Sequence, residues 1–574
     1  MENTPSPPAH APAQASAGQT ASPEHADQAP DAQSFCDIVR GHARTNGAEL
    51  AFTFGDDETT FAALDKASNQ VANGLAAMGI GKGERVAFLG KNHPYYFEAL
   101  LGAAKIGAVM TPVNWRLAPP EIAYILDNCE ARVVFVGDGF GEILAQLRGE
   151  LGRIEHVIAI APSAPDTAPD TAPDTGHQTS QTEHAGAHDY AQWRGQFPDT
   201  DPAIAIGLDD DALQLYTSGT TGRPKGAVMT HGSILSSRHT ADDAAQEVRT
   251  WQEPVPGDVT LLAMPCFHIS GTGTGIGTMV AGTNAIVLPE YDPARALDLI
   301  ENYNISKIFL VPAAIQILLN HPRIAEVDFS RLQYVTYGAS PIPLELMKEA
   351  MDVLGCGFVQ MYGMTETSGT IVALDPEDHV PEGSPRMRSV GKPLQGVEIK
   401  IIDETGATLG PDTVGEIATR SSKNMSRYWN NPEATAQTID ADGWLRTGDA
   451  GYLDRDGYLY IHDRVKDMII SGGENVYPAE VENALYAHPG VADVAVIGVP
   501  DEKWGEAVKA CVVVKAGHTL SEADVIAHAR GHIAGYKCPK SVDFIAALPR
   551  NPSGKILRRE LRAPYWQGRE RAVN

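Results

Sequence analysis

The 574-residue sequence contains only six cysteines, and no two of them form a CxxC pair. Closely spaced cysteines mark zinc ribbons, redox motifs and disulfide frameworks, so their isolation argues against all three. The sequence also lacks a basic N-terminal segment followed by an apolar core, since its first Lys or Arg is Arg40. Secretory and organelle signals need such segments. We therefore expect a reducing, cytoplasmic location.

Positive charge is scarce as well. Lys and Arg total 45 against 73 Asp and Glu, which gives a formal net charge of −28. This excess opposes nonspecific attraction to nucleic acid or anionic lipid. One long uncharged run, residues 259–289, includes five glycines and His268, a composition too polar for a bilayer span. We expect no nucleic-acid partner and no membrane span, while a homodimer remains open.

Two stretches lack the apolar residues that a core requires. Residues 1–33 are rich in Ala and Pro, and residues 162–190 contain the tetrapeptide APDT three times, beginning at Ala164, Ala168 and Ala172. Such segments bury too little apolar surface to offset the entropy of ordering. The prediction is a disordered tail over 1–33 and a low-complexity loop insertion over 162–190.

The remaining sequence alternates short apolar segments with amphipathic ones. A helical pattern over residues 61–78 is followed by an apolar segment at 85–89, and the same rhythm recurs at 95–106 and 108–112. Buried parallel strands connected by helices produce this spacing. The fold class predicted for the larger part of the chain is therefore α/β, with sheets of parallel type.

The pattern changes in the C-terminal third. From about residue 393, Asp-Gly pairs at 442–443 and 456–457 indicate hairpins and an antiparallel β subdomain. Beyond residue 466 a smaller α+β pattern follows. We predict a large N-terminal domain over residues 34–465 and a small C-terminal domain over residues 466–574.

The segment Tyr216–Gly226, YTSGTTGRPKG, is the most informative in the chain. Glycines and hydroxyl residues alternate in it, so backbone N–H groups and side-chain oxygens can surround one anion, and Lys225 adds positive charge. It is not a Walker A loop, because the spacing GxxxxGK[ST] is missing. The segment predicts polyphosphate binding by Thr217, Ser218, Gly219, Thr220, Thr221, Gly222 and Lys225.

Five further segments follow in order, and with this loop they resemble the adenylate-forming superfamily of acyl-CoA synthetases, luciferases and peptide-synthetase adenylation domains. They are YGASP at 337–341, QMYGMTE at 360–366, WLRTGD at 444–449, DRVKDMIISGGENVYP at 463–478 and PRNPSGK at 549–555. The resemblance covers residues 34–560, and the sequences of these motifs are most similar to those of fatty-acid and aryl-acid CoA ligases.

The resemblance implies a two-step reaction that uses ATP, Mg²⁺ and CoA. A carboxylate attacks the α-phosphate of ATP to form acyl-AMP, and the thiol of CoA then attacks the mixed anhydride. A medium- or long-chain fatty acid is the expected substrate. Aryl or steroid side-chain acids, transfer to a carrier protein, luciferase-like oxygen chemistry and a degenerate nucleotide-binding scaffold are the alternatives.

The resemblance also assigns nucleotide-binding roles. Glu366 would hold Mg²⁺ on the phosphates, although a carboxylate facing a helix dipole is the simpler interpretation. Asp449 would accept the ribose hydroxyls, unless it only closes an Asx turn. Tyr362 would stack on adenine. The other implied ATP- and AMP-binding residues are Gly338, Ala339, Ser340, Pro341, Gly363, Thr365 and Arg464.

The remaining roles concern the acid, the thiol and domain movement. Lys555 is the implied catalytic lysine of adenylation. His268 resembles a gate beside the acyl carboxylate, with a structural histidine as the alternative. The implied acyl pocket comprises His268, Gly271, Gly273, Tyr337 and Gly338, although the glycines could instead permit close helix packing. Gly472, Gly473 and Glu474 would line the CoA tunnel. Lys466 would be the hinge between the N-terminal adenylation domain and a mobile C-terminal domain.

Overall fold

The computed structural model describes residues 32–160, 187–217, 223–239, 251, 254–340, 342–464, 467–471, 474–501, 504–550 and 555–567. Most of the predicted tail and insertion therefore lies outside the described residues. The same holds for these predicted site residues: Ser218, Gly219, Thr220, Thr221, Gly222, Pro341, Lys466, Gly472 and Gly473.

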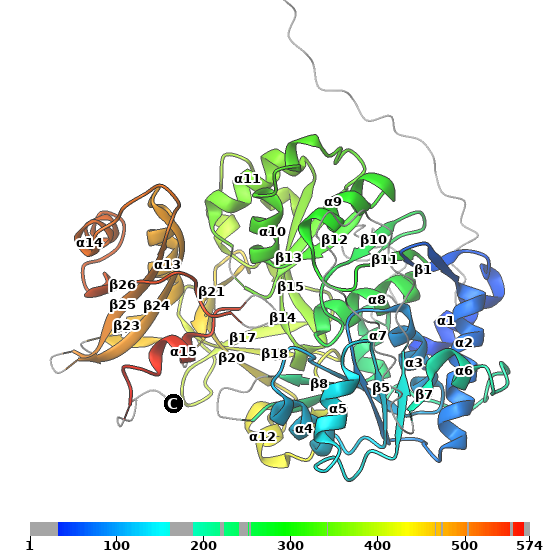
Figure 1. Ribbon diagram of the computed structural model, residues 1–574. Helices are drawn as coiled ribbons and strands as arrows, with labels where there is room; N and C mark the ends of the chain where they lie inside the picture. Colours follow the sequence, from blue (N-terminus) through cyan, green and yellow to red (C-terminus); the bar gives the residue numbers. More distant parts are fainter. Residues whose placement is uncertain are drawn as a thin grey trace, which may run out of the picture.

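Two large sheets form the body of the molecule (Figure 1). The nine-stranded sheet has the order β16-β15-β14-β13-β12-β10-β11-β1-β2, and the eight-stranded sheet has the order β19-β9-β8-β4-β3-β5-β6-β7. Strands of the first are β1 (Leu50–Phe54), β2 (Asp57–Thr60), β10 (Val259–Leu262), β11 (Asn284–Val287), β12 (Lys307–Leu310), β13 (Tyr334–Gly338), β14 (Gly357–Met364), β15 (Gly369–Leu374) and β16 (Lys392–Pro393). Strands of the second are β3 (Arg85–Leu89), β4 (Val109–Val113), β5 (Val133–Val136), β6 (His156–Ala159), β7 (Ala187–Asp189), β8 (Asp211–Thr217), β9 (Lys225–Thr230) and β19 (Arg427–Tyr428).

Helices pack on both faces of each sheet. The main hydrophobic cluster joins the two sheets through α1 (Phe35–Thr45), α2 (Phe61–Ala77), α3 (Pro94–Lys105) and α8 (Ile269–Ala281). A second cluster packs α9 (Pro293–Asn302), α10 (Pro312–Leu319) and α11 (Leu344–Leu354) on the other face of the nine-stranded sheet. A third packs α4 (Pro119–Asn128) and α5 (Gly141–Leu147) on the other face of the eight-stranded sheet. The body also contains α6 (Tyr190–Arg194), α7 (His231–His239) and α12 (Pro432–Thr438).

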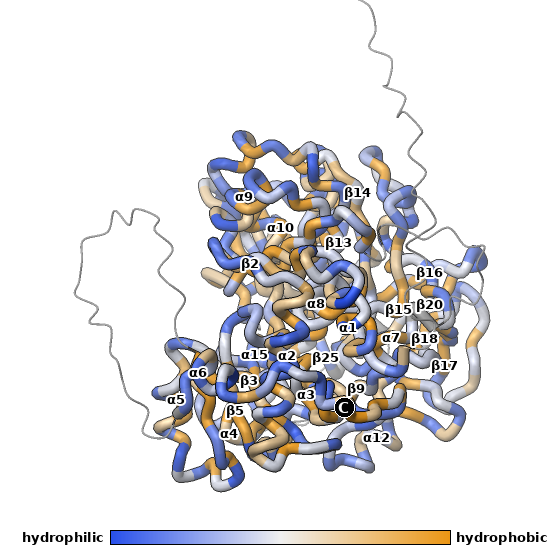
Figure 2. The backbone as a smooth tube through the Cα atoms, turned by 90° about the vertical axis from the view of Figure 1, so that its right-hand side faces the viewer, coloured by the Kyte–Doolittle hydropathy of each residue, from blue (hydrophilic) through white to orange (hydrophobic). Residues whose placement is uncertain are grey.

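The sequence pattern explains why these strands are covered on both faces. In β3, Val86 and Phe88 face the main cluster, whereas Ala87 and Leu89 face the third cluster. Successive side chains of a strand point to opposite faces, so a continuous apolar run needs a helix layer on each side. Hydrophilic segments lie along the outer loops and helix ends (Figure 2).

An antiparallel sheet follows, as the Asp-Gly pairs predicted. It consists of β17 (Glu398–Ile402), β18 (Gly415–Arg420), β20 (Leu445–Leu453) and β21 (Leu459–Arg464). The Asp456–Gly457 pair joins β20 to β21 in a hairpin. The Asp442–Gly443 pair instead links α12 to β20, because the local turn closes on a bridge between Ile439 and Leu445.

The C-terminal unit, residues 467–567 as far as described, has a core of its own. Its strands are β22 (Ile469–Ser471), β23 (Glu474–Val476), β24 (Val491–Asp501), β25 (Gly505–Val514) and β26 (Ser541–Phe544), and its helices are α13 (Pro478–Tyr486), α14 (Glu522–Arg530) and α15 (Arg558–Arg562). In Figure 1 this unit, orange to red, stands beside the large body near β21. The predicted fold class is confirmed.

The predicted insertion extends too far at its C-terminal end. Residues Ala187–Asp189 form β7, which pairs with β6 in a parallel ladder. Asp189 then caps α6 by accepting a hydrogen bond from the Gln192 backbone N–H at 2.9 Å. A three-residue strand is too short to show periodicity, so only its pairing partner reveals it. Among the described residues, no helix combines the length and hydropathy that a bilayer crossing requires.

Candidate active site

Glu366 occupies a short 3₁₀ helix (Thr365–Thr367) directly after β14. Its side chain is buried, with the residue 5% exposed. Glu366 Oε1 accepts hydrogen bonds from the Thr217 hydroxyl at 3.1 Å and the Tyr428 hydroxyl at 2.8 Å. Both partners are neutral, and no Lys or Arg of the described chain forms an ion pair with this carboxylate. A buried carboxylate in such surroundings is suited to a hard cation.

The two ends of the predicted phosphate loop meet at this carboxylate. Thr217 ends β8 and Lys225 begins β9, and the two residues are partners in the antiparallel ladder. Lys225 Nζ lies 5.1 Å from the centre of the Tyr428 ring. Thr217 and Lys225, which flank the predicted loop, are therefore side by side, and Thr217 contacts Glu366 directly.

A second pair of polar residues joins the large body to the antiparallel sheet. The Tyr362 hydroxyl donates a hydrogen bond to Asp449 Oδ2 at 2.8 Å. Asp449 is 9% exposed, and its partner across the β20–β21 ladder is Arg464, whose side chain is not described. The sequence-predicted ribose ligand and adenine-stacking ring are thus neighbours.

The backbone between these groups is unusually close-packed. A Cβ on Gly338 would lie 2.2 Å from the Met361 carbonyl oxygen, and a Cβ on Gly363 would lie 2.0 Å from the Gly369 carbonyl oxygen. Only glycine fits at either position. Ala339, which follows Gly338, has φ of +66°, a conformation that costs free energy for a residue with a side chain. Such strain occurs most often at functional sites.

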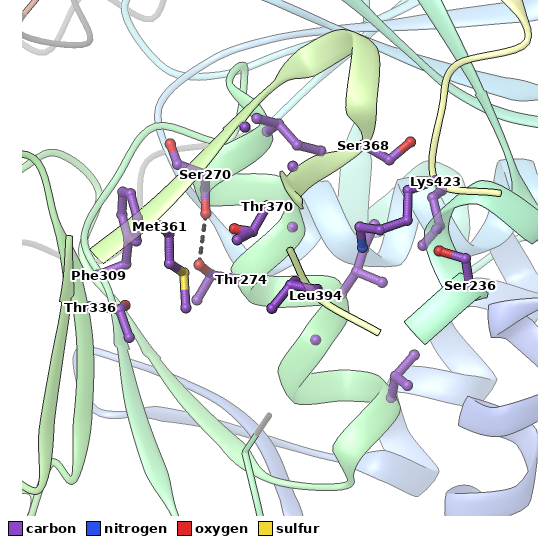
Figure 3. Close-up of a pocket in the computed structure, with 18 of the residues that line it drawn as sticks. Ser236, Ser270, Thr274, Phe309, Thr336, Met361, Ser368, Thr370, Leu394 and Lys423 are labelled. Atoms are coloured by element: carbon purple, nitrogen blue, oxygen red, sulfur yellow. Dashed lines mark hydrogen bonds between the residues drawn. The ribbon is translucent and has the colours of Figure 1, made fainter. Parts of the chain in front are cut away.

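A cavity of about 360 Å³ opens from Ala339 and Gly363 and runs between the nine-stranded sheet and α8. In Figure 3, Thr274, Met361, Phe309 and Thr336 gather on one side of it, and Ser236, Ser368 and Lys423 on the other. Its apolar wall contains Leu213, Ile234, Leu235, Trp251, Pro254, Ile269, Ile276, Val280, Ile308, Phe309, Met361 and Leu394. This size and lining are typical of a small-molecule site.

The glycines of α8 serve two different purposes. Gly273 and Gly277 line the cavity, and a Cβ on either would meet no atom closer than 3.8 Å. Gly271 and Gly275 permit packing instead, because a Cβ would lie 2.3 Å from the Pro265 carbonyl oxygen or 2.2 Å from the Phe97 ring. Both interpretations left open by the sequence therefore apply, at alternating positions.

Four predicted acyl-pocket residues do not line this cavity: His268, Gly271, Tyr337 and Gly338. Tyr337 points to the opposite face of the sheet, where its hydroxyl contacts His379 Nε2 at 2.9 Å. Thr336, the preceding residue, faces the cavity because strand side chains alternate. The prediction was wrong for Tyr337, since the motif does not reveal which face α8 covers.

His268 precedes α8 and lies against the Phe267 ring at a centroid distance of 4.7 Å. Its Nε2 is buried and has no hydrogen-bond partner in the described part of the chain. Burial, with a smaller effect of the Arg116 charge, lowers the pKa of His268 to about 4. The ring is therefore neutral near pH 7, and it cannot act there as a cation.

Lys555 lies in the C-terminal unit and is half-buried. Its neighbour Arg558 donates to Glu482 Oε2 at 2.7 Å, and Arg562 forms an ion pair with Asp467 at 3.0 Å. These contacts attach α15, which follows Lys555, to α13 and to Asp467. Glu474, the predicted CoA-contacting residue, lies in β23 with an undescribed side chain.

Sequence reasoning missed Tyr428 and most of the cavity wall. Tyr428 reaches Glu366 only because β19 pairs with β9, a contact between segments about 200 residues apart in the sequence. The wall residues of β10 and β12 belong to ordinary-looking apolar strands. No local motif could have identified either.

Comparisons with known proteins place this geometry in one family. The family model of AMP-binding enzymes matches residues 39–429, and that of the AMP-binding enzyme C-terminal domain matches residues 480–555. The chain is 40% identical over 546 residues to a fatty acid–[acyl-carrier-protein] ligase of Streptomyces coeruleorubidus, covering 95% of this chain and 99% of the relative. It is 37% identical over 524 residues to a feruloyl-CoA synthase of Amycolatopsis sp, covering 91% and 97%.

A solved anthranilate CoA ligase in complex with anthranoyl-AMP matches the structure with a TM-score of 0.80 and 28% identity, over 93% of this chain and 97% of that one. The family and the enzyme class predicted from the sequence are thus confirmed. The chain belongs to the AMP-binding enzymes, and its class is that of an AMP-forming acid–thiol ligase that uses ATP.

Proposed function

We propose that this chain activates an elongated carboxylic acid, a medium- or long-chain fatty acid, as its acyl-AMP and transfers the acyl group to CoA. The position and the length of the cavity are the main support for this proposal. It begins at Ala339 and Gly363, beside the predicted nucleotide site, and extends between sheet and helix past the open positions at Gly273 and Gly277. A small acid such as acetate would leave most of that volume unfilled.

The nucleotide is proposed to bind along the edge where Glu366, Tyr362 and Asp449 gather. Asp449 would accept the ribose hydroxyls, Tyr362 would stack on adenine, and the backbone near Ala339 would bound the ring. The phosphates would lie against the loop that Thr217 and Lys225 delimit. The further proposed nucleotide contacts come from Ser218, Gly219, Thr220, Thr221, Gly222, Gly338, Ser340, Pro341, Gly363, Thr365 and Arg464.

Mg²⁺ fits the Glu366 carboxylate, which is buried against two neutral hydroxyl groups. Bound there, the ion would neutralise charge that develops on the phosphates as the carboxylate attacks. The Thr217 and Tyr428 hydroxyls donate to Oε1 and so fix the orientation of the carboxylate. Lys225, near the Tyr428 ring, would add a positive charge on the same side.

Lys555 is proposed to supply the cation that bridges the acid carboxylate and the α-phosphate. The domain division at residues 465 and 466 belongs to the same proposal, with Lys466 as the hinge about which the C-terminal unit turns. After the turn, Gly472, Gly473 and Glu474 would line the path of the CoA thiol. Because Asp467 is paired with Arg562, rotation about Lys466 would carry Lys555 with it.

The experiment that tests this proposal separates the two half-reactions. Lys555→Ala should lose about 10²-fold or more in pyrophosphate release from acid and ATP, since one preorganised cation is missing from the transition state. Thioester formation from presynthesised acyl-AMP should be preserved within a few fold. Equal losses in both assays would contradict the role given to Lys555.

Transfer to a carrier protein is the second candidate, favoured by the 40% identity to the fatty acid–[acyl-carrier-protein] ligase. The two are distinguished by supplying acyl-AMP with either CoA or a phosphopantetheinylated carrier protein and comparing kcat/KM. Aryl and steroid side-chain acids are tested in the same panel by pyrophosphate release. A cytoplasmic location and a homodimer remain predictions.

A further inference from the structure

The far end of the acyl cavity is polar, and the strand register locates it. Thr260 of β10 is the ladder partner of Lys307 of β12, and Lys307 is in turn the partner of Tyr334 of β13. Gly338, at the nucleotide end, lies four residues further along β13 and pairs with Met361. At about 3.3 Å per residue, the Thr260–Lys307 level is about 13 Å from the nucleotide end.

Thr260 and Lys307 both line the cavity, whereas their strand neighbour Leu261 belongs to the cluster on the other face of the sheet. On the helix side, Val280 lines the wall near the C-terminal end of α8. Because α8 connects two parallel strands, it runs back along the sheet, and its C-terminal end lies at the same end of the cavity as Thr260. The cavity therefore has an apolar middle and a polar floor.

Lys307 contributes a compensated charge to this floor. Its Nζ lies 2.6 Å from Asp258 Oδ2, with side chains only 7% and 3% exposed. Asp258 also accepts hydrogen bonds from the Ser306 hydroxyl at 2.9 Å and the Val255 backbone N–H at 2.8 Å. The floor is thus polar but close to electrically neutral, and a second full charge would be costly there.

Thr260 is the unusual member of the floor. The residue is 5% exposed, and within the described chain its Oγ1 has no hydrogen-bond partner. Two other cavity-lining threonines differ: the Thr274 hydroxyl donates to the Ser270 carbonyl at 2.7 Å, and that of Thr336 to the Ile308 carbonyl at 3.4 Å. An unsatisfied buried hydroxyl costs free energy, and such groups call for a missing partner.

We propose that the preferred acid carries a neutral oxygen, a hydroxyl or keto group, at the end remote from its carboxylate, and that Thr260 hydrogen-bonds this oxygen beside Lys307. The inference deepens the proposed function and rests on it. An acid that ends in a methyl group leaves Thr260 unsatisfied. One that ends in an ammonium group places a second positive charge beside Lys307.

The test compares unbranched acids in matched pairs, each with a terminal methyl or a terminal hydroxyl, over a range of chain lengths. Pyrophosphate release with ATP and CoA gives kcat/KM for each acid. The full-length protein should favour the hydroxylated member by about 10-fold or more at one chain length, because a buried polar group is then paired. The preference should disappear for shorter acids, which do not reach the floor.

Thr260→Val removes the hydroxyl at nearly constant volume and should reduce that preference to within a few fold, mainly by improving the methyl-terminated acid. Thr111→Val is the matched control. Thr111 is a fully buried threonine of β4 whose Oγ1 also lacks a partner in the described chain, and it does not line the cavity. This control should retain the preference.

The outcomes separate the inference from the proposed function. Pyrophosphate release with a methyl preference at every length, as expected if only a water satisfied Thr260, would overturn the inference alone. So would a hydroxyl preference that Thr260→Val leaves unchanged. If no unbranched acid of either series supported pyrophosphate release, the proposed function would fail, and the inference with it.

Discussion

The helix α8 allows a direct test of how its glycines shape the acyl cavity. Gly273 faces open space, where a new Cβ would meet only the Ile269 side chain at 3.8 Å. Gly275, half a turn away, is packed against Phe97, where a new Cβ would lie 2.2 Å from the ring. The same substitution, Gly→Ala, should therefore have opposite effects at two positions of one helix.

The expected magnitudes follow from these contacts. Gly273→Ala should stabilise the protein by about 0.5–1 kcal/mol, because alanine loses less backbone entropy in a helix interior. Gly275→Ala receives the same helical gain but must displace Phe97, a fully buried ring stacked on Phe52 at 4.7 Å. Overpacking of this kind costs about 1–3 kcal/mol, so Gly275→Ala should be the less stable variant.

Activity should change in the opposite sense to stability at Gly273. The new methyl group enters the cavity wall, so the ratio of kcat/KM for long over short acids should fall by about 10-fold, the effect of roughly one methylene in an apolar pocket. Thermal unfolding and pyrophosphate release over an acid series measure the two effects. An unchanged acid preference in Gly273→Ala would refute the assignment of this wall to the acyl chain, and a Gly275→Ala variant as stable as the parent would refute the packing argument.

Three further predictions concern the metal, the hinge and acid stability. Glu366→Gln keeps the two hydroxyl contacts but removes the charge, so both half-reactions should slow and the Mg²⁺ requirement should rise; full rate at limiting Mg²⁺ would exclude the ligand role. Lys466→Pro should retain pyrophosphate exchange but lose most thioester formation from acyl-AMP, because proline fixes φ near about −65°; Lys466→Ala is the control, and full thioester activity in the proline variant would argue against a hinge. Burial lowers the pKa of His231 to about 4, and both ring nitrogens lack partners in the described chain. Its contribution to stability is therefore present above its unfolded pKa of about 6.5 and is lost, by up to about 3 kcal/mol, as the pH falls toward 4. His231→Leu should flatten the pH dependence of unfolding over that interval, and an unchanged profile would contradict the burial argument.

The sequence alone determined the family, the enzyme class and the element types. These features are local, because each depends on residues that are close together in the sequence. They are the phosphate loop, the motif around Glu366 and the alternation of apolar strands with helices. The parallel strand at residues 85–89 and the helix at 61–78 were predicted for this reason, and the structure has β3 over Arg85–Leu89 and α2 over Phe61–Ala77. Chemistry carried by contiguous residues can be read without knowing the packing.

Only the tertiary structure decided which faces and segments meet. The motif around Tyr337 marks the end of a strand, but the choice between Thr336 and Tyr337 as the cavity-facing residue depends on where α8 packs. Likewise, Tyr428 contacts Glu366, and Thr260 lies beside Lys307, through pairing of strands that are distant in the chain. The sequence of a buried strand does not show which of its two faces will line a cavity, because the layers that cover the faces come from elsewhere in the chain.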